Sequence, residues 1–417
     1  MQFFFPDSQD QVDPLFDFCT ERHPSHRVRQ RDDRYAHELL TAPAYDGLLV
    51  SKATVDGVRQ RAGKYTMAQQ QRLYRLGIRR FFRLEQGWAA DLVTMGDCGA
   101  FNYVDEDEPP YTVDEVIDFY AGIGVDRGVA VDHIIFGYLS ENQRAAGVQP
   151  DEEWPRRQAL TLELAGEFWD RASTRRCRFE PVGVAHGWDP LSYAASVTAL
   201  QRIGYRRIAL GGMVPLKNAD IIEVLAAISD VRDPGVEFHL LGVTRHEYVP
   251  VFQRYGVTSF DSTSPFRRAF KDETDNFYTV GERFTALRVP QVDAMLGLKR
   301  LISSGKVDQG TAIAAEKTAL RTLRAYDRDE AGLDEAVAAL RAFEEIWDRR
   351  HDRSDRYRAT LAARPWQDCH CGICDEAGIE VAIFRGSERN KRRGFHNLAV
   401  FRQELDAVGD AAVALAS

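Results

Sequence analysis

Three aspartates stand at or just beyond the ends of short apolar runs, where their carboxylates could share one site. Asp97 ends the run DLVTMGD, Asp132 follows GVAV, and Asp261 ends GVTSFD. Two carboxylates that approach each other separate their titrations, so that one holds a proton while the other is ionised. We therefore predict an acid–base site from these residues, provided that the fold brings the ends of the runs together.

Each of these residues also has a purely structural interpretation. Asp261 resembles a helix N-cap before SPFRRAF, because Asp caps and an early Pro are common at helix starts. Asp97 could brace the turn that follows it, and Asp132 could pair with an arginine. The other candidates have ordinary readings too: a tight turn at Gly211 and Gly212, a strand-end hydrogen bond for His186, and core packing for Phe101.

A cluster of sulfur and imidazole ligands lies near the C-terminus. Cys369, Cys371, Cys374 and His396 follow the pattern C-x-C-x2-C-x21-H, and three of the chain's six cysteines fall in this short stretch. Four such ligands complete a tetrahedral zinc site with no open position, which is the structural kind. His370 is a weaker ligand candidate, because both of its neighbours already point at the metal. We predict a structural zinc ion.

The net charge of −9 gives no overall attraction for nucleic acid, so such binding would need local basic patches. One patch is residues 385–393, RGSERNKRR, with five basic side chains and one acidic. A second patch, Arg267, Arg268 and Lys271, follows Asp261. The alternative for each patch is an ordinary solvated surface.

The sequence carries no feature that predicts a membrane location. No apolar run approaches the roughly 20 residues of a membrane helix, and MQFFFPDSQD lacks the basic start and long apolar stretch of a signal peptide. From these features we expect a cytoplasmic protein with no membrane partner.

The elements that must position these residues alternate in type between about residues 45 and 300. Short β-rich runs are separated by segments of helical periodicity, such as TVDEVIDFYAGIG and NADIIEVLAAISDV. The strand candidates are GLLVS, DLVTMGD, GVAVDHIIF, FEPVGVAHG, RRIALGGM, EFHLLGV and GVTSFD. Nearly continuous apolar strands alternating with helices indicate a parallel sheet covered on both faces.

About eight strand–helix units over roughly 250 residues favour a (β/α)8 TIM barrel within the α/β class. A doubly wound sheet is the alternative, and both folds place ligands at the carboxyl ends of the strands, where the candidate residues lie. We expect residues 1–350 to form the barrel with an N-terminal extension. Residues 351–417 would form a zinc-binding subdomain and a C-terminal helix that packs back on the barrel.

Six segments in order resemble the motifs of one superfamily, the tRNA-guanine transglycosylases, over most of the chain from about residue 90. These segments are GDCGAF (96–101), AVDH (130–133), GVAHG (183–187), ALGGMV (209–214), LLGV (240–243) and FDSTSPFRRA (260–269). They are similar to the family's D-S-G-G-F, guanine-reading aspartate, V-Q-G, G-G-L, M-G-V and F-D-C-V-x-P-T-R-x-A. The cysteine–histidine cluster occupies the family's zinc position.

The resemblance implies a role for each candidate residue. Asp261 would be the nucleophile that forms a covalent aspartyl-glycosyl intermediate, and Asp97 the group that transfers protons to and from the bases. Phe101 and Leu241 would cover the two faces of the base. The edge of the base would be read by Asp132, His186, Gly211, Gly212 and Met213. The basic residues expected to contact phosphates are Arg267, Arg268, Arg389, Arg392 and Arg393.

Several departures from the family pattern resemble its DNA-acting branch, which inserts 7-cyano-7-deazaguanine (preQ0) into DNA. His186 replaces a glutamine, and Phe266 and Phe270 replace a threonine and an arginine that would face RNA. The resemblance thus implies that guanine in DNA is replaced by preQ0. The target base would have to flip out of the duplex, and an ATP-using companion protein would assist. The alternatives are a tRNA-guanine transglycosylase acting on tRNA, and a non-catalytic, zinc-stabilised nucleic-acid-binding subunit.

Overall fold

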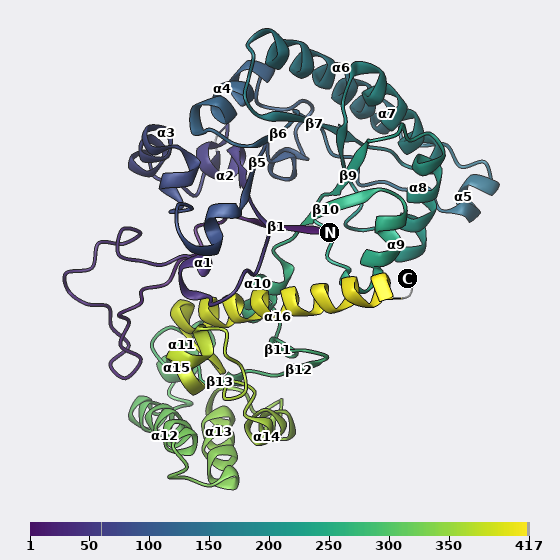
Figure 1. Cartoon of the computed structure of the whole chain (residues 1–417). Helices are drawn as coiled ribbons and strands as arrows, with labels where there is room; N and C mark the ends of the chain where they lie inside the picture. Colours follow the sequence, from purple (N-terminus) through teal and green to yellow (C-terminus); the bar gives the residue numbers. More distant parts are fainter. Residues whose placement is uncertain (60, 415–417) are drawn as a thin grey trace. The chain divides into compact units, whose positions relative to one another are not determined.

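Eight parallel strands form a closed barrel in the computed structural model, which describes residues 1–59 and 61–414 (Figure 1). The strands neighbour one another in chain order, and the last pairs with the first. They are β1 (Gln2–Pro6), β2 (Gly47–Ser51), β5 (Val93–Asp97), β6 (Arg127–Val129), β7 (Glu180–Ala185), β8 (Arg207–Leu210), β9 (Glu237–Leu240) and β10 (Val257–Asp261). The predicted α/β barrel is confirmed.

The first strand of the barrel is the one that the sequence patterns did not identify. β1 lies between β10 and β2, with Phe3 opposite Phe260 and Phe4 opposite Gly47. Gly47 is required there, because a β-carbon at that position would lie 2.3 Å from the Phe4 ring. The apolar start of the chain therefore closes the barrel.

The barrel interior is filled with aliphatic and aromatic side chains. Phe4, Leu49, Met95, Val129, Val182, Val184 and Ala209 form one buried cluster. Val93 and Leu241 pack against this cluster from its margin. The filled interior leaves the carboxyl ends of the strands as the place for a site.

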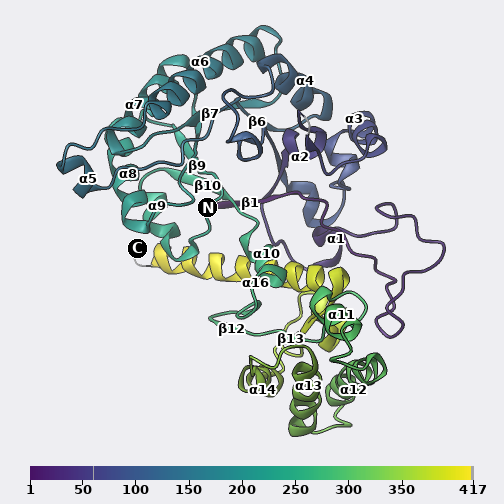
Figure 2. The same ribbon diagram turned by 180° about the vertical axis from the view of Figure 1, so that it is seen from behind.

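Helices surround the strands in both views (Figures 1 and 2). They are α2 (Lys52–Asp56), α3 (Met67–Phe81), α4 (Val113–Ile123), α5 (Glu141–Ala145), α6 (Glu153–Thr174), α7 (Pro190–Ile203), α8 (Asn218–Asp230) and α9 (Val249–Arg254). Local signals start several of them, since Thr66 and Thr112 form capping boxes and Asp189 caps α7 just before Pro190. A small hairpin, β3 (Gly57–Val58) with β4 (Arg61–Ala62), follows α2.

The chain divides into two compact units. The barrel unit comprises Met1–Gln9, Tyr45–Thr263 and the chain from Leu405, and the second unit comprises Asp10–Ala44 and Ser264–Glu404. The boundary predicted at residue 350 does not separate the units, because α13 and α14 on either side of it pack together in the second one. The helical tract before residue 350 and the cysteine cluster thus belong to one unit.

The second unit is mainly helical. Its helices are α1 (Ala36–Leu39), α10 (Ser264–Lys271), α11 (Leu296–Ser303), α12 (Gln309–Asp327), α13 (Leu333–Trp347), α14 (Ser354–Ala363), α15 (Ile373–Ala377) and most of α16 (Gly386–Ala414). Its strands pair as β11 (Phe277–Thr279) with β12 (Glu282–Phe284) and β13 (Leu287–Arg288) with β14 (Ile383–Phe384). No helix in the described part of the chain is long and apolar enough to cross a membrane.

Candidate active site and metal centre

The barrel brings the three predicted aspartates to one end. Asp97 and Asp261 are the last residues of β5 and β10, and Asp132 follows β6 by three residues. Asp132 and Asp261 are buried, and both are close enough for their charges to act on Asp97. The carboxylates therefore form a single cluster at the carboxyl ends of the strands.

Asp97 is a member of this cluster that can hold a proton near neutral pH. Burial raises its pKa to about 7, and the charges of Asp132 and Asp261 act in the same direction. The neighbouring Gly99 backbone and the Ser51 side chain act against this shift. Near neutral pH this carboxyl group can both donate and accept a proton, as a general acid–base residue must.

Asp132 is held by a chain of buried side chains. His186 approaches one carboxylate oxygen through Nε2 at 2.7 Å, and the Cys98 thiol donates to the other at 3.0 Å. Tyr103 donates to the Cys98 sulfur and lies 3.1 Å from the Asp132 carbonyl oxygen. Burial raises the pKa of Cys98 well above its usual value, so the thiol keeps its proton. These contacts fix the plane of the Asp132 carboxylate.

Asp261 is anchored through one carboxylate oxygen. The Gly242 backbone N–H donates to Oδ1 at 3.0 Å, and His239 Nε2 lies 3.2 Å from the same atom. The other ring nitrogen of His239 lies 2.9 Å from the Ser259 hydroxyl. In the described part of the chain no hydrogen bond reaches Oδ2 of Asp261, which leaves this oxygen available for chemistry.

His239, Cys98 and Tyr103 were not identified from the sequence as parts of the site. His239 did carry a signal, since it is a polar residue inside the apolar run EFHLLGV. Its side chain is fully buried on β9, next to the strand that ends in Asp261. A buried histidine two residues before Leu241 could therefore have been suspected of serving the site.

The residues expected to hold a flat ligand lie around the same end of the barrel. Phe101, on the short helix η2 (Ala100–Tyr103), is 64% exposed and packs edge-on against Phe136 at 5.5 Å. Gly211 is constrained, because a β-carbon there would lie 2.2 Å from the His186 ring. Gly212 has a φ of 75° and approaches the Ile135 carbonyl, where a β-carbon would come within 2.3 Å. Both glycines keep the backbone close to the neighbouring loops.

The four predicted metal ligands converge in the second unit. The sulfur atoms of Cys369, Cys371 and Cys374 lie 3.3–3.6 Å from Nδ1 of His396. A tetrahedral zinc site with ordinary bond lengths separates sulfur from nitrogen by about 3.6 Å, so the donor set fits this ion. The Nε2 of His396 lies 2.7 Å from the Tyr278 carbonyl, which orients Nδ1 toward the cluster. His370 points away, is exposed and contacts Asp375.

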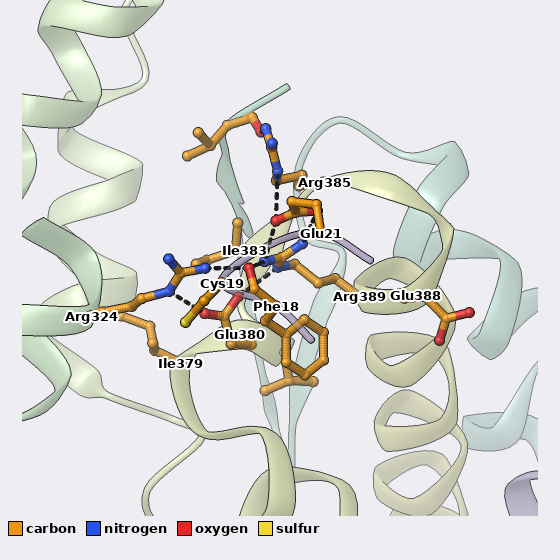
Figure 3. Close-up of polar contacts among 12 residues, drawn as sticks. Phe18, Cys19, Glu21, Arg324, Ile379, Glu380, Ile383, Arg385, Glu388 and Arg389 are labelled. Carbon is orange, nitrogen blue, oxygen red and sulfur yellow. Dashed lines mark hydrogen bonds and ion pairs between the residues drawn. The ribbon is translucent and has the colours of Figure 1, made fainter. Parts of the chain in front are cut away.

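The basic tract 385–393 is not a surface patch. The exposed fractions of Arg389, Arg392 and Arg393 are 1%, 2% and 0%. Arg389 pairs with Glu21 and Glu380, as Figure 3 shows. These guanidinium groups are therefore turned into the protein, and the phosphate contacts expected for them are corrected to a structural role.

The other two arginines of the tract make similar internal contacts. Arg392 pairs with Glu388 at 2.8 Å, and its guanidinium also donates to the Asp13 carbonyl. Arg393 donates to the carbonyl oxygens of Ala269, Val381 and Ile383, and burial lowers its pKa to about 9. The Arg393 side chain thereby binds the backbone of α10 at Ala269.

Helix α10 presents both kinds of residue predicted for it. Arg267, Arg268 and Lys271 are exposed, as a phosphate contact would require. Phe266 is buried and stacks on Phe395 at 5.5 Å, with Phe270 edge-on at 5.3 Å. The ring of Phe266, which stands in place of a family threonine, therefore packs inside the second unit.

Comparison with known proteins gives one extended match. A curated protein named DNA-guanine transglycosylase, from Salmonella montevideo, is 48% identical over 410 residues, which cover 97% of this chain and 96% of that protein. No protein-family model matches the chain.

The metal centre predicts a stability effect. Cys371→Ser should lower the metal content from about one zinc per chain and lower the melting temperature, because binding energy at a closed site is partly folding energy. Elemental analysis and thermal unfolding measure the two effects. His370→Gln is the matched control, since His370 lies outside the ligand set, and it should retain both. A wild type that is purified without metal, or a Cys371→Ser variant that melts at the wild-type temperature, would contradict the assignment.

The raised pKa of Asp97 predicts a pH-dependent stability. The folded protein holds a proton that the unfolded chain releases between about pH 4 and pH 7, so this residue lowers stability as the pH rises through that range. Asp97→Asn has no charge to bury and should gain stability over wild type at about pH 8, with little gain at about pH 4. Urea unfolding at both values measures this. The exposed Asp91→Asn control should show no such difference, and equal pH profiles for Asp97→Asn and wild type would rule out the buried charge.

Proposed function

The chain belongs to the guanine transglycosylase superfamily and is a guanine transglycosylase, and on this basis we propose that it replaces guanine in DNA with preQ0. The observation that carries the proposed mechanism is the convergence of Asp97, Asp132 and Asp261, with the pKa of Asp97 raised to about 7. DNA is proposed as the polymer because the curated relative is named a DNA-guanine transglycosylase. The proposed location is the cytoplasm.

The proposed reaction is a double displacement. Oδ2 of Asp261 attacks the anomeric carbon of the target nucleotide, and the bond to guanine breaks with its electron pair moving to the base nitrogen. Asp97 in its protonated form supplies the proton that the departing guanine needs. The incoming base then gives its proton to Asp97 and attacks the same carbon, which releases Asp261. Two inversions leave the sugar configuration unchanged.

The base would lie between Phe101 and Leu241, with its edge toward Asp132. A carboxylate can accept from a ring N–H and an exocyclic amine together, which guanine and its deaza analogue both offer. The bonds from His186 and Cys98 hold Asp132 in one orientation for this contact. His186, Gly211, Gly212 and Met213 complete the proposed edge. For duplex DNA the target base has to leave the stack to enter such a site.

The zinc ion, held by Cys369, Cys371, Cys374 and His396, is proposed to be structural, since a set of four protein ligands leaves no position for substrate. Arg267, Arg268 and Lys271 are proposed to contact phosphates from the exposed face of α10. An ATP-using companion protein is proposed to assist on DNA.

Offering labelled preQ0 with DNA or tRNA tests the function. The wild type, with any required companion present, should place label in DNA and not in tRNA. Asp261→Asn should give no incorporation and no denaturant-resistant protein–DNA adduct, because the amide cannot act as the nucleophile. Nucleoside mass spectrometry and denaturing gels measure these results. Incorporation confined to tRNA would restore tRNA as the substrate, and wild-type exchange by Asp261→Asn would remove the proposed nucleophile.

The contacts of Asp261 predict a positioning effect of His239. His239→Phe removes the ring nitrogen that holds Oδ1 and should lower kcat by about 10- to 100-fold with a small change in KM, because the substrate-binding residues remain. Ser259→Ala frees His239 to rotate and should give a smaller loss in kcat. Single-turnover exchange on DNA measures both. If His239→Phe and Ser259→Ala lost the same amount of kcat and the same amount of thermal stability, the role of His239 would be purely structural.

A further inference from the structure

A long irregular loop near the N-terminus carries a basic face that the motifs did not identify. Residues 22–31, RHPSHRVRQR, contain four arginines and two histidines and no acidic residue. The chain from Val12 to Arg34 has no helix, and its ends meet through paired backbone hydrogen bonds between these two residues. Loops of this length without regular structure are usually functional or disordered. The contacts of this loop show that its backbone is held in place.

The loop is anchored at its base by a buried ion-pair network, drawn in Figure 3. Glu21 pairs with Arg389 at 2.8 Å and with Arg385 at 3.2 Å. The Phe18 carbonyl accepts from Arg324 at 2.7 Å and from Arg389 at 3.1 Å. Charge-assisted bonds of this kind hold the backbone just before Arg22 in one position.

Three acidic residues of the loop form hydrogen bonds or ion pairs with other groups of the loop. Asp33 is buried and receives two bonds from Arg27, at 2.7 and 2.9 Å. Asp13 is buried and contacts His23 at 2.8 Å. Asp32 accepts from the Val28 backbone at 2.6 Å. These three carboxylates fold the loop from inside, while Asp17 is exposed and accepts hydrogen bonds from Cys19 and Thr20.

The arginines that remain outside face solvent. Between residues 22 and 34 every exposed charged side chain apart from histidine is an arginine. Arg31 pairs with Asp32 and Arg34 with Glu38. Within the described part of the chain, no carboxylate forms an ion pair with Arg22 or Arg29. These two cations are therefore exposed and uncompensated.

Both free arginines stand on an ordered backbone. Arg22 is bonded to Asp17 through paired backbone groups, in an isolated bridge. Arg29 lies in the turn that begins at Val28, whose carbonyl accepts from the Arg31 and Asp32 N–H groups. A cation on a fixed backbone loses less conformational entropy when it binds than one on a disordered tail.

We propose that Arg22 and Arg29 of this loop contact the phosphate backbone of the DNA substrate. The inference rests on the proposed function, which supplies the polymer. It assigns to this loop the cationic role that the buried 385–393 tract was expected to perform, and it couples the two, because Arg385 and Arg389 anchor the loop from inside the protein. Phosphate contacts of this kind supply affinity and position without reading sequence.

Salt-dependent DNA binding tests this proposal. Arg22→Gln/Arg29→Gln should weaken binding of a labelled DNA duplex at least about tenfold near 0.1 M salt, measured by fluorescence anisotropy. It should also reduce the slope of log K against log salt by about 2, since each phosphate contact contributes about 0.9. Arg22→Lys/Arg29→Lys keeps the charges and should bind within about threefold of wild type.

A matched control removes the same charge elsewhere in the second unit. Arg349→Gln/Arg350→Gln alters two exposed arginines at the end of α13 and should leave both the affinity and the slope unchanged. Exchange should remain at the wild-type rate in Arg349→Gln/Arg350→Gln, because this variant changes neither the carboxylate cluster nor the loop.

The possible results separate the two proposals. If the wild type binds DNA and the glutamine variant binds equally well, the loop contact is wrong while the DNA substrate stands. If the control variant loses as much affinity as the loop variant, general surface charge and not this loop is responsible. If the wild type does not bind or modify DNA with its companion present, the DNA substrate fails and the loop contact with it.

Discussion

Repulsion among carboxylates in a place with little water is the constraint that organises one end of the barrel. Burial in the first place, and the charges of Asp132 and Asp261 in the second, raise the pKa of Asp97 to about 7, so that this residue can take up a proton. Asp132 and Asp261 respond through hydrogen bonds from His186, Cys98, Gly242 and His239. The same crowding therefore separates the three carboxyl groups into one that carries protons and two that are oriented acceptors. Neighbours on four different strands or loops are needed to sustain this, which explains why a closed barrel is a suitable scaffold.

The sequence patterns located most of the barrel because each strand end carries its own local signal. Seven runs preceded polar or glycine residues, and those ends became the site. The strand β1 was missed because it precedes the alternation of strands and helices, from about residue 45, on which the prediction rested. His239 was missed for a related reason, since its importance depends on Asp261 in the neighbouring strand. Contacts across strands, and not the elements themselves, are what local patterns leave out.

The basic tract shows how a charge run can be misread even when its helix is clear. Arg392 and Arg389 precede His396 by four and seven residues, which places both of them on its face of α16. A histidine that binds metal has to face inward, so the arginines on its face do so as well. That spacing was readable from the sequence. Glu21, the carboxylate partner of Arg389, was not, because it lies more than 350 residues earlier in the chain.

The pairing of early with late segments of the chain also determines when these contacts can form during synthesis. β1 leaves the ribosome before the other strands of the barrel, its neighbour β10 follows about 250 residues later, and Arg389 follows Glu21 after a still longer stretch of chain. At about 5–20 residues per second, the edge of β1 that pairs with β10 lacks its partner for roughly ten seconds or more. Exposed strand edges are prone to aggregate during that interval. Because the barrel closes through β1, the growing chain has to keep this apolar edge from pairing with other chains until β10 has been made. Chaperones that cover hydrophobic segments would serve this need.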